Sequence, residues 1–278
     1  MLRLSSLWTV SLVVTSWCFG QTVDAPPDDR QSETEAAKKF QAQAQAAASE
    51  YELRAGGRGS GKCTRVPEPI LRWANPLGGH RAHGEIFLWA KDGLPLAVLS
   101  INEFTRVNGK IDREHEWCSL SNEPLSATGL HLWSPQSAEL SFNSISIDEE
   151  LADSPTQRLR QMRGLATRFS GTKTTRAGEI RTLRLMPQPI YRYQSKDANT
   201  PDGGLFALVE ATDPEALLIM ETRRGSNSAH VWHYAFARLN SVKLTASLDG
   251  RQVWEASGLA AAEVYDRADK PYTAFIIK

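Results

Sequence analysis

The sequence predicts a mainly β protein leaning to α+β, in which two similar meanders of antiparallel strands form a sandwich or a filled barrel. Apolar runs meet at Asp92-Gly93 and at Asp249-Gly250, and an Asp-Gly pair between apolar runs favours a tight β-hairpin. The segment Val231–Leu239 is apolar at both strand phases, which is typical of a strand covered on both faces. The third observation is that residues 84–133 resemble residues 204–254.

Five landmarks of the earlier stretch recur in the later stretch at a nearly constant offset. They are Phe87 and Phe206, Ala97 and Ala216, and Leu125–Thr128 and Leu244–Ser247 at 119 residues, Trp117 and Trp232 at 115, and Trp133 and Trp254 at 121. A duplicated unit with small loop insertions leaves such a pattern. Chance matching of common residue types is the alternative explanation.

Residues 1–20 have the features of a signal peptide. Arg3 is followed by an uncharged, largely apolar run, and Gly20 provides a small residue before a cleavage point. A membrane anchor is disfavoured because the run is short and interrupted by serines and threonines. A lipoprotein is disfavoured because the bulky Trp17 directly precedes Cys18. We therefore expect export to the periplasm or the extracellular space, with no integral membrane segment after cleavage.

Residues 21–62 are predicted to form an N-terminal helical arm and a glycine-rich linker. Ser32 and Glu35 have the spacing of a capping box, and the helix is expected to run to about Arg54, before Gly56-Gly57. One side of this helix carries a narrow seam made of Ala37, Phe40, Ala44, Ala47 and Tyr51. The seam is rich in alanine, so it favours weak self-association at most.

Residues 63–278 are predicted to form one β-rich globular domain, with helix 155–170 joining the two repeats. Ser154 is its expected N-cap, and Gln157 completes a capping box. The expected strands are Glu85–Lys91, Leu94–Ile101, Glu114–Ser121, Leu130–Trp133, Glu139–Ile147 with a bulge, Ile180–Met186, Ile190–Tyr193, Leu205–Ala211, Ala216–Glu221, Val231–Leu239, Leu244–Leu248 and Arg251–Glu255. A turn is expected at Asp213-Pro214, between two of these strands.

Two cysteines, Cys63 and Cys118, remain after removal of residues 1–20. In an oxidising compartment an even pair predicts a disulfide, which would close a long loop and stabilise the fold by about 3–4 kcal/mol. The alternative is a pair of unbonded thiols, with Cys118 buried in a strand as a small apolar residue.

Short motifs over residues 67–256 resemble a known group of sequences. They are Leu71–Pro76, Phe87–Trp89 with Asp92-Gly93, Ser119–Ser121, Arg158–Arg163, Leu183–Tyr193 and Arg238–Ser241. Together they are similar to an uncharacterised family of exported bacterial proteins of unknown function. The resemblance implies an export-associated setting. It supplies no activity, and no functional residue is carried over from it.

Charge gives the clearest indication of a ligand. Lys and Arg together balance Asp and Glu at 32 each, which argues against a nucleic-acid partner. Locally, residues 158–192 hold eight arginines and Lys173 against the single acid Glu179. The candidate ligand-binding residues are Arg158, Arg160, Arg163, Arg168 and Arg192. Guanidinium groups suit carboxylates and phosphates, so an anionic glycan or envelope polymer is the expected partner; the alternative is a solvated helix face paired with nearby acids.

Histidines and carboxylates provide weaker candidates. His80 and His83 would share a metal if Glu85 or His115 joined them, and otherwise are ordinary loop histidines. His115 and Glu116 are candidates for acid–base catalysis, but neighbouring residues of a strand point to opposite faces, so each needs a partner from elsewhere.

The sequence therefore favours an exported, non-enzymatic binding module without a cofactor. The first alternative is a hydrolase with a site between the loop at residues 80–83 and the strand at residues 114–121. The second alternative is a structural or assembly protein that uses the alanine-rich seam.

Overall fold

The structure is a computed structural model that describes residues 27–56, 61–75, 81–105, 109–146, 150–195, 200–224 and 229–277. The chain divides into two compact units, Met1–Phe40 and Gln41–Lys278, and every described strand belongs to the second unit. The predicted signal peptide at residues 1–20 lies outside the described residues.

The described helices are α1 (Pro27–Ser49), α2 (Pro155–Ala166) and α3 (Ala261–Val264). The strands before α2 are β1 (Glu52–Ala55), β2 (Gly61–Lys62), β3 (Thr64–Arg65), β4 (Leu71–Asn75), β5 (Arg81–Lys91), β6 (Leu94–Thr105), β7 (Ile111–Ser119), β8 (Leu125–Thr128) and β9 (Asn143–Ser144). The strands after α2 are β10 (Phe169–Thr174), β11 (Ile180–Leu185), β12 (Tyr191–Ser195), β13 (Thr200–Glu210), β14 (Asp213–Arg224), β15 (His230–Arg238), β16 (Lys243–Leu248), β17 (Arg251–Ala256) and β18 (Tyr272–Ile277).

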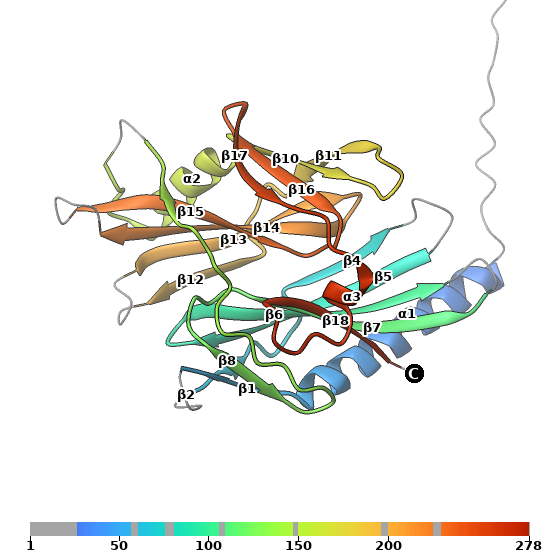
Figure 1. The fold of residues 1–278 in the computed structure, drawn as a ribbon. Helices are drawn as coiled ribbons and strands as arrows, with labels where there is room; N and C mark the ends of the chain where they lie inside the picture. Colours follow the sequence, from blue (N-terminus) through green and yellow to red (C-terminus); the bar gives the residue numbers. More distant parts are fainter. Residues whose placement is uncertain are drawn as a thin grey trace, which may run out of the picture. The chain divides into compact units, whose positions relative to one another are not determined.

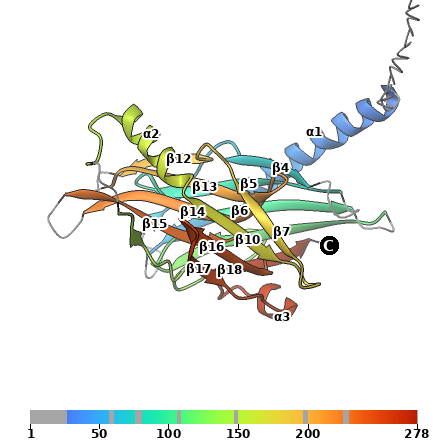
Figure 2. The same cartoon turned by 90° about the horizontal axis from the view of Figure 1, so that it is seen from above.

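The long strands form two facing layers, and the predicted mainly β, antiparallel fold is confirmed (Figure 1). The first layer has the order β18-β7-β6-β5, with β3 and β4 both paired to the outer edge of β5. In the second layer the order is β17-β16-β10-β11-β13-β14-β15-β9, and β12 also pairs with β13. The view from above shows α2 crossing the second layer (Figure 2).

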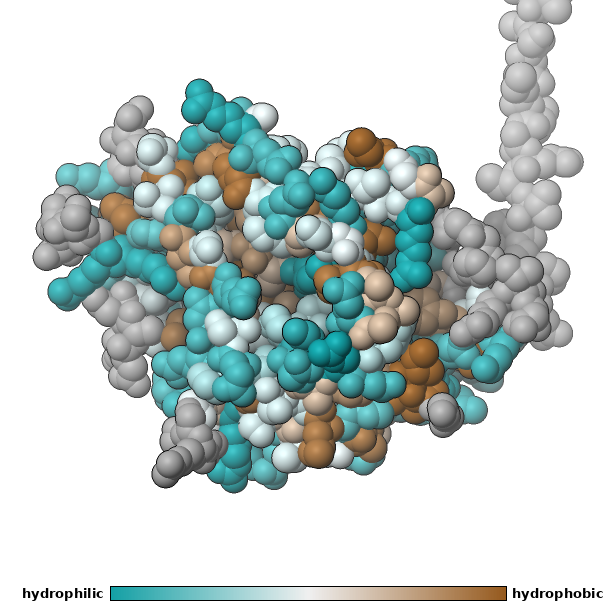
Figure 3. Space-filling model, in the orientation of Figure 1, coloured by the Kyte–Doolittle hydropathy of each residue, from teal (hydrophilic) through white to brown (hydrophobic). Residues whose placement is uncertain are grey.

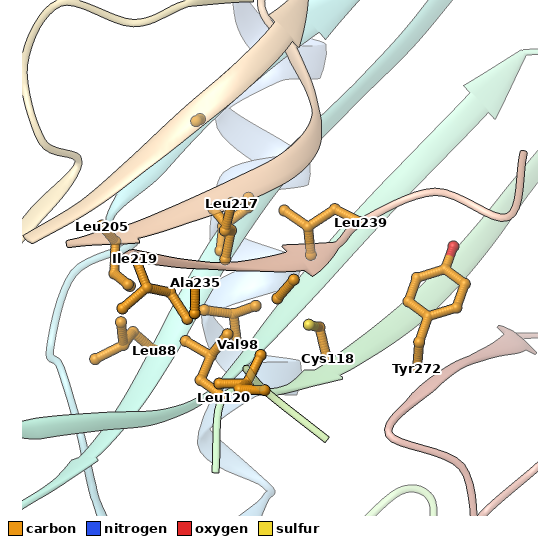
Figure 4. Packing of buried hydrophobic residues seen from close by; sticks show 14 of the residues in the cluster. Leu88, Val98, Cys118, Leu120, Leu205, Leu217, Ile219, Ala235, Leu239 and Tyr272 are labelled. Atoms are coloured by element: carbon orange, nitrogen blue, oxygen red, sulfur yellow. The ribbon is translucent and has the colours of Figure 1, made fainter. Parts of the chain in front are cut away.

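Apolar side chains fill the space between the layers. Leu88, Val98, Cys118 and Leu120 of the first layer face Leu205, Leu217, Ile219, Ala235 and Leu239 of the second (Figure 4). The opposite face of the second layer is also apolar, since Phe206, Trp232 and Phe236 are buried with Met162 of α2. The predicted covering of Val231–Leu239 on both faces is confirmed.

The strand pairing of the first layer recurs in the second. Phe87 pairs with Leu99 between β5 and β6, and Phe206 pairs with Leu218 between β13 and β14, 119 residues later. Each hairpin also has a register shift at the same place, beside Trp89 in one and Leu208 in the other. In both layers the residue opposite this shift is a proline, Pro95 or Pro214.

The edge strands repeat the same arrangement. Two linkers have similar sequences: Val-Pro-Glu-Pro-Ile at Val66–Ile70 and Met-Pro-Gln-Pro-Ile at Met186–Ile190. Each linker joins two short strands that pair with the same long strand, β3 and β4 with β5 and β11 and β12 with β13. Trp73 then lies opposite Gly84, and Tyr193 lies opposite Gly203. A Cβ atom at Gly84 or Gly203 would come within 2.7 Å or 2.4 Å of the facing ring, so both positions require glycine.

One landmark of the sequence comparison is corrected by the register. Trp117 pairs with Leu99, and the residue that pairs with Leu218 is Phe236. Trp117 therefore corresponds to Phe236 at the common offset of 119, and Trp232 lies four residues earlier on the same face of β15. An aromatic residue at every second position of β15 caused the mismatch.

We call the strands before α2 the first half of the fold and those after α2 the second half. The last strand of each half pairs with the layer that the other half forms. Residues 143–144, at the end of the first half, form β9 and pair with His233 and Tyr234 of β15. Strand β18, at the end of the second half, pairs with β7 from Arg113 to Cys118. Each layer therefore depends on a strand that the chain supplies from the other half.

Three predicted helix ends are wrong. α1 begins at Pro27, before the predicted cap at Ser32, and stops at Ser49 instead of continuing to Arg54. Residues 52–55 alternate between exposed and buried, and they form β1 beside β8. In α2 the cap at Ser154 is confirmed, but the helix ends at Ala166 instead of at residue 170, and Phe169 starts β10.

Three further predictions differ from the structure. Ala44 and Tyr51 of the alanine-rich seam are buried inside the second unit, so the predicted seam is not one continuous exposed surface. Asp213 and Pro214 lie in β14, and the turn is at Ala211, whose φ is 54°. The strand predicted at Leu130–Trp133 reduces to a single bridge between Ala127 and Trp133.

Candidate functional site

A groove of about 590 Å³ lies between the β5–β6 hairpin of the first layer and the strands β13 and β14 of the second layer. We call it the inter-layer groove, and both layers line it. Its apolar lining includes Leu94, Leu96, Leu120, Phe142 and Ile219, and its charged lining consists of Lys91, Asp92, Glu123, Glu221, Arg223 and Arg224. A cavity of this size with a mixed lining is typical of sites that bind small molecules.

One wall of the inter-layer groove is a chain of polar contacts. The Tyr193 hydroxyl donates to Glu221 Oε2 at 2.6 Å, and Arg223 Nε donates to Glu221 Oε1 at 2.6 Å. The Arg223 guanidinium also lies over the Phe142 ring, 3.4 Å from its centroid. These contacts fix the Arg223 side chain, while Arg224 is exposed at the rim.

A second, smaller cavity of about 120 Å³ lies where β6 and β7 meet the start of β14. We call it the carboxylate pocket, because Glu114, Glu116 and Asp213 all line it. Tyr272 donates a hydrogen bond to Glu116 Oε1, and Asn102 donates to Glu116 Oε2 at 3.4 Å. Asn75 of the first layer donates to Asp213 Oδ2 of the second at 3.2 Å, so this pocket also joins the layers.

Burial shifts the protonation of the pocket's carboxyl groups. It raises the pKa of Glu114 to about 7, and the pKa of Glu116 is raised well above its ordinary value by burial and by the neighbouring Glu114. Burial and the nearby Glu215 raise the pKa of Asp213 to about 7. These groups therefore hold protons at pH values where ordinary carboxyl groups are ionised.

The two cavities are lined by corresponding residues. Three residues that line the groove have a counterpart, 119 positions away in the sequence, that lines the pocket. The pairs are Leu94 with Asp213, Ile219 with Ser100, and Glu221 with Asn102. Tyr193 and Trp73 correspond in the same way at 120 positions. The groove is therefore the larger and more apolar of the two corresponding sites, and the carboxylate pocket is the smaller and more polar one.

The predicted pair of His115 and Glu116 is divided between two faces of β7. Glu116 lines the carboxylate pocket, whereas His115 is buried beside Tyr51, whose hydroxyl lies 2.8 Å from His115 Nδ1. Burial and the nearby His131 lower the pKa of His115 to about 4, so it is neutral at pH 7. The alternation of side chains along a strand, noted from the sequence, is the reason for this separation.

Only His83 of the histidine pair predicted as a metal site lies among the described residues. His80 lies outside the described residues, and His83 Nε2 is 3.8 Å from Glu103 Oε1 on β6. Burial lowers the pKa of His83, and Glu103 partly opposes that shift. Within the described ranges, no group of three or more His, Cys, Asp or Glu side chains is arranged to hold a metal ion.

Residues 158–192, with their predicted excess of arginine, form what we call the basic band. Most of its basic side chains make contacts within the protein. Arg158 Nε is 3.1 Å from Asp202 Oδ2, and Arg192 Nε donates to Asp202 Oδ1 at 2.8 Å. Arg168 pairs with Asp249 at 2.5 Å. Of the five predicted ligand-binding arginines, Arg160 and Arg163 are the two that remain exposed, and Arg163 donates to the Pro187 carbonyl. These pairs connect α2 and β10 to their neighbours.

We expect Asp202→Ala to lower the free energy of unfolding by about 3 kcal/mol, because it leaves two guanidinium groups beside a buried site without their counter-ion. The matched control is Asp249→Asn, which tolerates the positive φ of this residue; its pair with Arg168 is more exposed and is expected to contribute less than about 1 kcal/mol. Urea unfolding measures both. Equal losses in the two variants would contradict the structural role of the Arg158–Asp202–Arg192 contacts.

The predicted disulfide between Cys63 and Cys118 is absent from the structure, and both cysteines are buried free thiols. Cys63 adjoins β3, which pairs with β5, whereas Cys118 lies on β7, so β5 and β6 separate them. Three strand spacings amount to about 14 Å, and a disulfide requires Cα atoms within about 7 Å. Burial raises the pKa of the Cys63 thiol to about 11, which disfavours the reactive thiolate.

Sequence reasoning did not single out Tyr193, Glu221, Arg223 or Phe142 as one site. The available signals were the charged end Glu221–Arg224 of an otherwise apolar strand and the aromatic Tyr193, which follows the second Pro-x-Pro motif. The face in Figure 3 carries mixed polar and apolar residues without one continuous apolar area. No described helix has the length and apolar character needed to cross a membrane.

Comparisons with protein-family models, with curated proteins and with solved structures gave no match for this chain.

Proposed function

We propose that the protein is an exported, non-enzymatic binding module of the cell envelope or extracellular space, and that its ligand lies in the inter-layer groove. The observation that carries this proposal is a groove of about 590 Å³ that is lined by both layers and contains Arg223, which Glu221 and Phe142 hold in place. Export is supported by the charge and apolar pattern of residues 1–20.

The ligand is an anionic envelope component. Arg223 and Arg224 are consecutive at the end of β14 and both line the groove, and Lys91 lies on the opposite hairpin. Guanidinium groups bind carboxylate and phosphate oxygens well, and Arg223 is already oriented by Glu221 and Phe142. The basic band offers less, because Arg158, Arg168 and Arg192 are paired with acids of the protein.

Two correspondences support the origin of the groove by internal duplication. The strand pairings of β5–β6–β7 and β13–β14–β15 match at an offset of 119 residues. Residues 61–70 and 181–190 also show the same order of exposed and buried positions. A duplicated unit places two equivalent corners at the junction, and one of them then became the ligand site.

Acid–base catalysis at the carboxylate pocket is a second candidate function. A pKa of about 7 for Glu114 and for Asp213 favours it, because a general acid or base works best near its own pKa. It would use Glu116 without His115. Hydrolysis of nitrophenyl esters or glycosides that disappears in Glu116→Gln supports this candidate, and a wild-type protein without such activity counts against it.

Native mass spectrometry of the full chain, exported by its own N-terminal segment and never reduced, tests the proposed function. The expected mature chain begins at Gln21, contains two free thiols and carries an anionic adduct. The adduct should be lost in Arg224→Glu and kept in Arg160→Glu, which reverses an equally exposed arginine on α2. An unprocessed chain retained in the cytoplasm contradicts export, and an adduct that survives Arg224→Glu contradicts the groove.

A further inference from the structure

We infer that the inter-layer groove binds a single-chain amphiphile: an apolar chain lies along the groove, and a carboxylate or phosphate head contacts Arg223 and Arg224. This inference rests on the proposed function and specifies its ligand.

The apolar part follows from comparison with the carboxylate pocket. Where the pocket has Asp213 and Ser100, the groove has Leu94 and Ile219 at the corresponding positions. Leu96 adds a third apolar lining residue, and its counterpart in the other half is the buried Glu215. Since the two corners share one backbone arrangement, these side chains account for the apolar character of the groove. A highly hydroxylated glycan would leave such a lining without polar partners.

The groove is open because its covering segment is small. At the carboxylate pocket, Val264, Tyr265 and Tyr272 of the C-terminal segment line the cavity, which has a volume of about 120 Å³. At the groove, the segment that crosses from the first half contributes Phe142, and about 590 Å³ remains. Arg223 covers one face of the Phe142 ring, and the ring forms part of the groove wall.

The head group follows from the arrangement of charge. Glu221 holds Arg223 at 2.6 Å and is itself held by the Tyr193 hydroxyl at 2.6 Å. Tyr193 and Glu221 are buried, and Arg224 is exposed on the same strand end. An anion at the groove gains the exposed Arg224 and a pre-oriented Arg223 whose charge is shared with Glu221. Asp92 and Glu123 also line the groove, so its three basic and three acidic groups balance, and the anion must lie at the Arg223–Arg224 end.

Calorimetric titration of the full chain tests the inference with four probes: dodecanoate, decanoate, dodecyltrimethylammonium and hexagalacturonate. We expect dodecanoate to bind with micromolar affinity and decanoate to bind about tenfold more weakly, because two fewer methylenes are buried. Dodecyltrimethylammonium should bind at least tenfold more weakly than dodecanoate. A cationic amphiphile that binds as well as dodecanoate overturns the head-group assignment.

Two groove variants and two controls locate the site. Leu96→Ser and Arg224→Glu should each weaken dodecanoate at least tenfold, whereas Ile180→Ser and Arg160→Glu, at exposed positions away from the groove, should not change it. Equal affinity in all four variants overturns the inference. If hexagalacturonate binds and loses affinity in Arg224→Glu while dodecanoate does not bind, the proposed function stands and the amphiphile is wrong. If neither probe responds to the groove variants, both are wrong.

Discussion

Replacement of Lys173 by methionine is expected to lower the free energy of unfolding by about 3–5 kcal/mol. Lys173 lies on β10, and its ammonium group contacts the carboxylates of Glu210 and Glu215. Glu215 is fully buried, so removal of the cation leaves a charged group in the protein interior. Asn240 Nδ2 continues to donate to Glu215 at 2.7 Å but supplies no positive charge.

The double variant Lys173→Met with Glu215→Leu provides the control. In the other half of the fold, Leu96 occupies the position that corresponds to Glu215. Ala55 is the counterpart of Lys173, because Ala55 pairs with Leu125 in the same way that Lys173 pairs with Leu244. The double variant should therefore recover much of the stability lost in Lys173→Met, because an apolar pair of similar volume replaces the ion pair. Urea unfolding at pH 8 measures all three proteins. A single variant as stable as the wild type would show that the buried pair does not hold β10 against β14.

Asp213→Asn is expected to stabilise the protein at pH 8 and to leave its stability unchanged at pH 4. Asp213 has a raised pKa of about 7 against an ordinary value of 3.8, chiefly because of burial. Below pH 4 both the folded and the unfolded states hold the proton. Between pH 4 and pH 7 the unfolded state releases it first, so stability falls as pH rises, by roughly 4 kcal/mol at most. An amide cannot ionise and avoids this loss.

Thermal unfolding of Asp213→Asn and the wild type across pH 4–8 checks this expectation. The difference between the two proteins should grow between pH 4 and pH 7 and then remain constant. Asp249→Asn is the matched control, because the Arg168 side chain lowers the pKa of that exposed carboxyl, and its difference should change only below pH 4. A constant difference for Asp213→Asn at all pH values would show that the pKa of Asp213 is the same in the folded and unfolded states.

The sequence predicted the fold class because strong local signals agreed. Asp92-Gly93 and Asp249-Gly250 form the expected hairpins, with positive φ at both residues of each pair. Ser154 caps α2 as its spacing with Gln157 indicated. The strand Val231–Leu239 has apolar residues on both faces, and both faces pack against a hydrophobic core, as expected. In each case a few neighbouring residues determined the local structure.

Predictions failed where distant contacts decided the outcome. Residues 52–55 read as the end of a helix, yet pairing with β8 makes them a strand. β18 has an apolar sequence but no nearby partner, and it joins β7, more than 150 residues earlier. Cys63 and Cys118 counted as an even pair, while their separation depends on the order of β3, β5, β6 and β7. Sequence spacing carries none of this information.

The candidate site shows the same division. The excess of arginine over residues 158–192 is visible in the sequence, but its main acidic partner, Asp202, comes later in the chain. The groove combines Leu94, Phe142, Tyr193 and Arg223 from four separate segments. Only the strand register, with its offset of 119 residues, relates this groove to the carboxylate pocket and assigns their differences to particular side chains.

Methyl NMR of the full chain labelled at isoleucine and leucine, titrated with dodecanoate, tests the central claim most directly. The groove account predicts saturable shifts at Leu94, Leu96 and Ile219. Methyl signals of Leu159 on α2 and Leu239 at the carboxylate pocket should not move. Shifts confined to α2 would return the ligand site to the basic band, and shifts centred on Leu239 would assign it to the carboxylate pocket; either result contradicts a ligand site in the inter-layer groove.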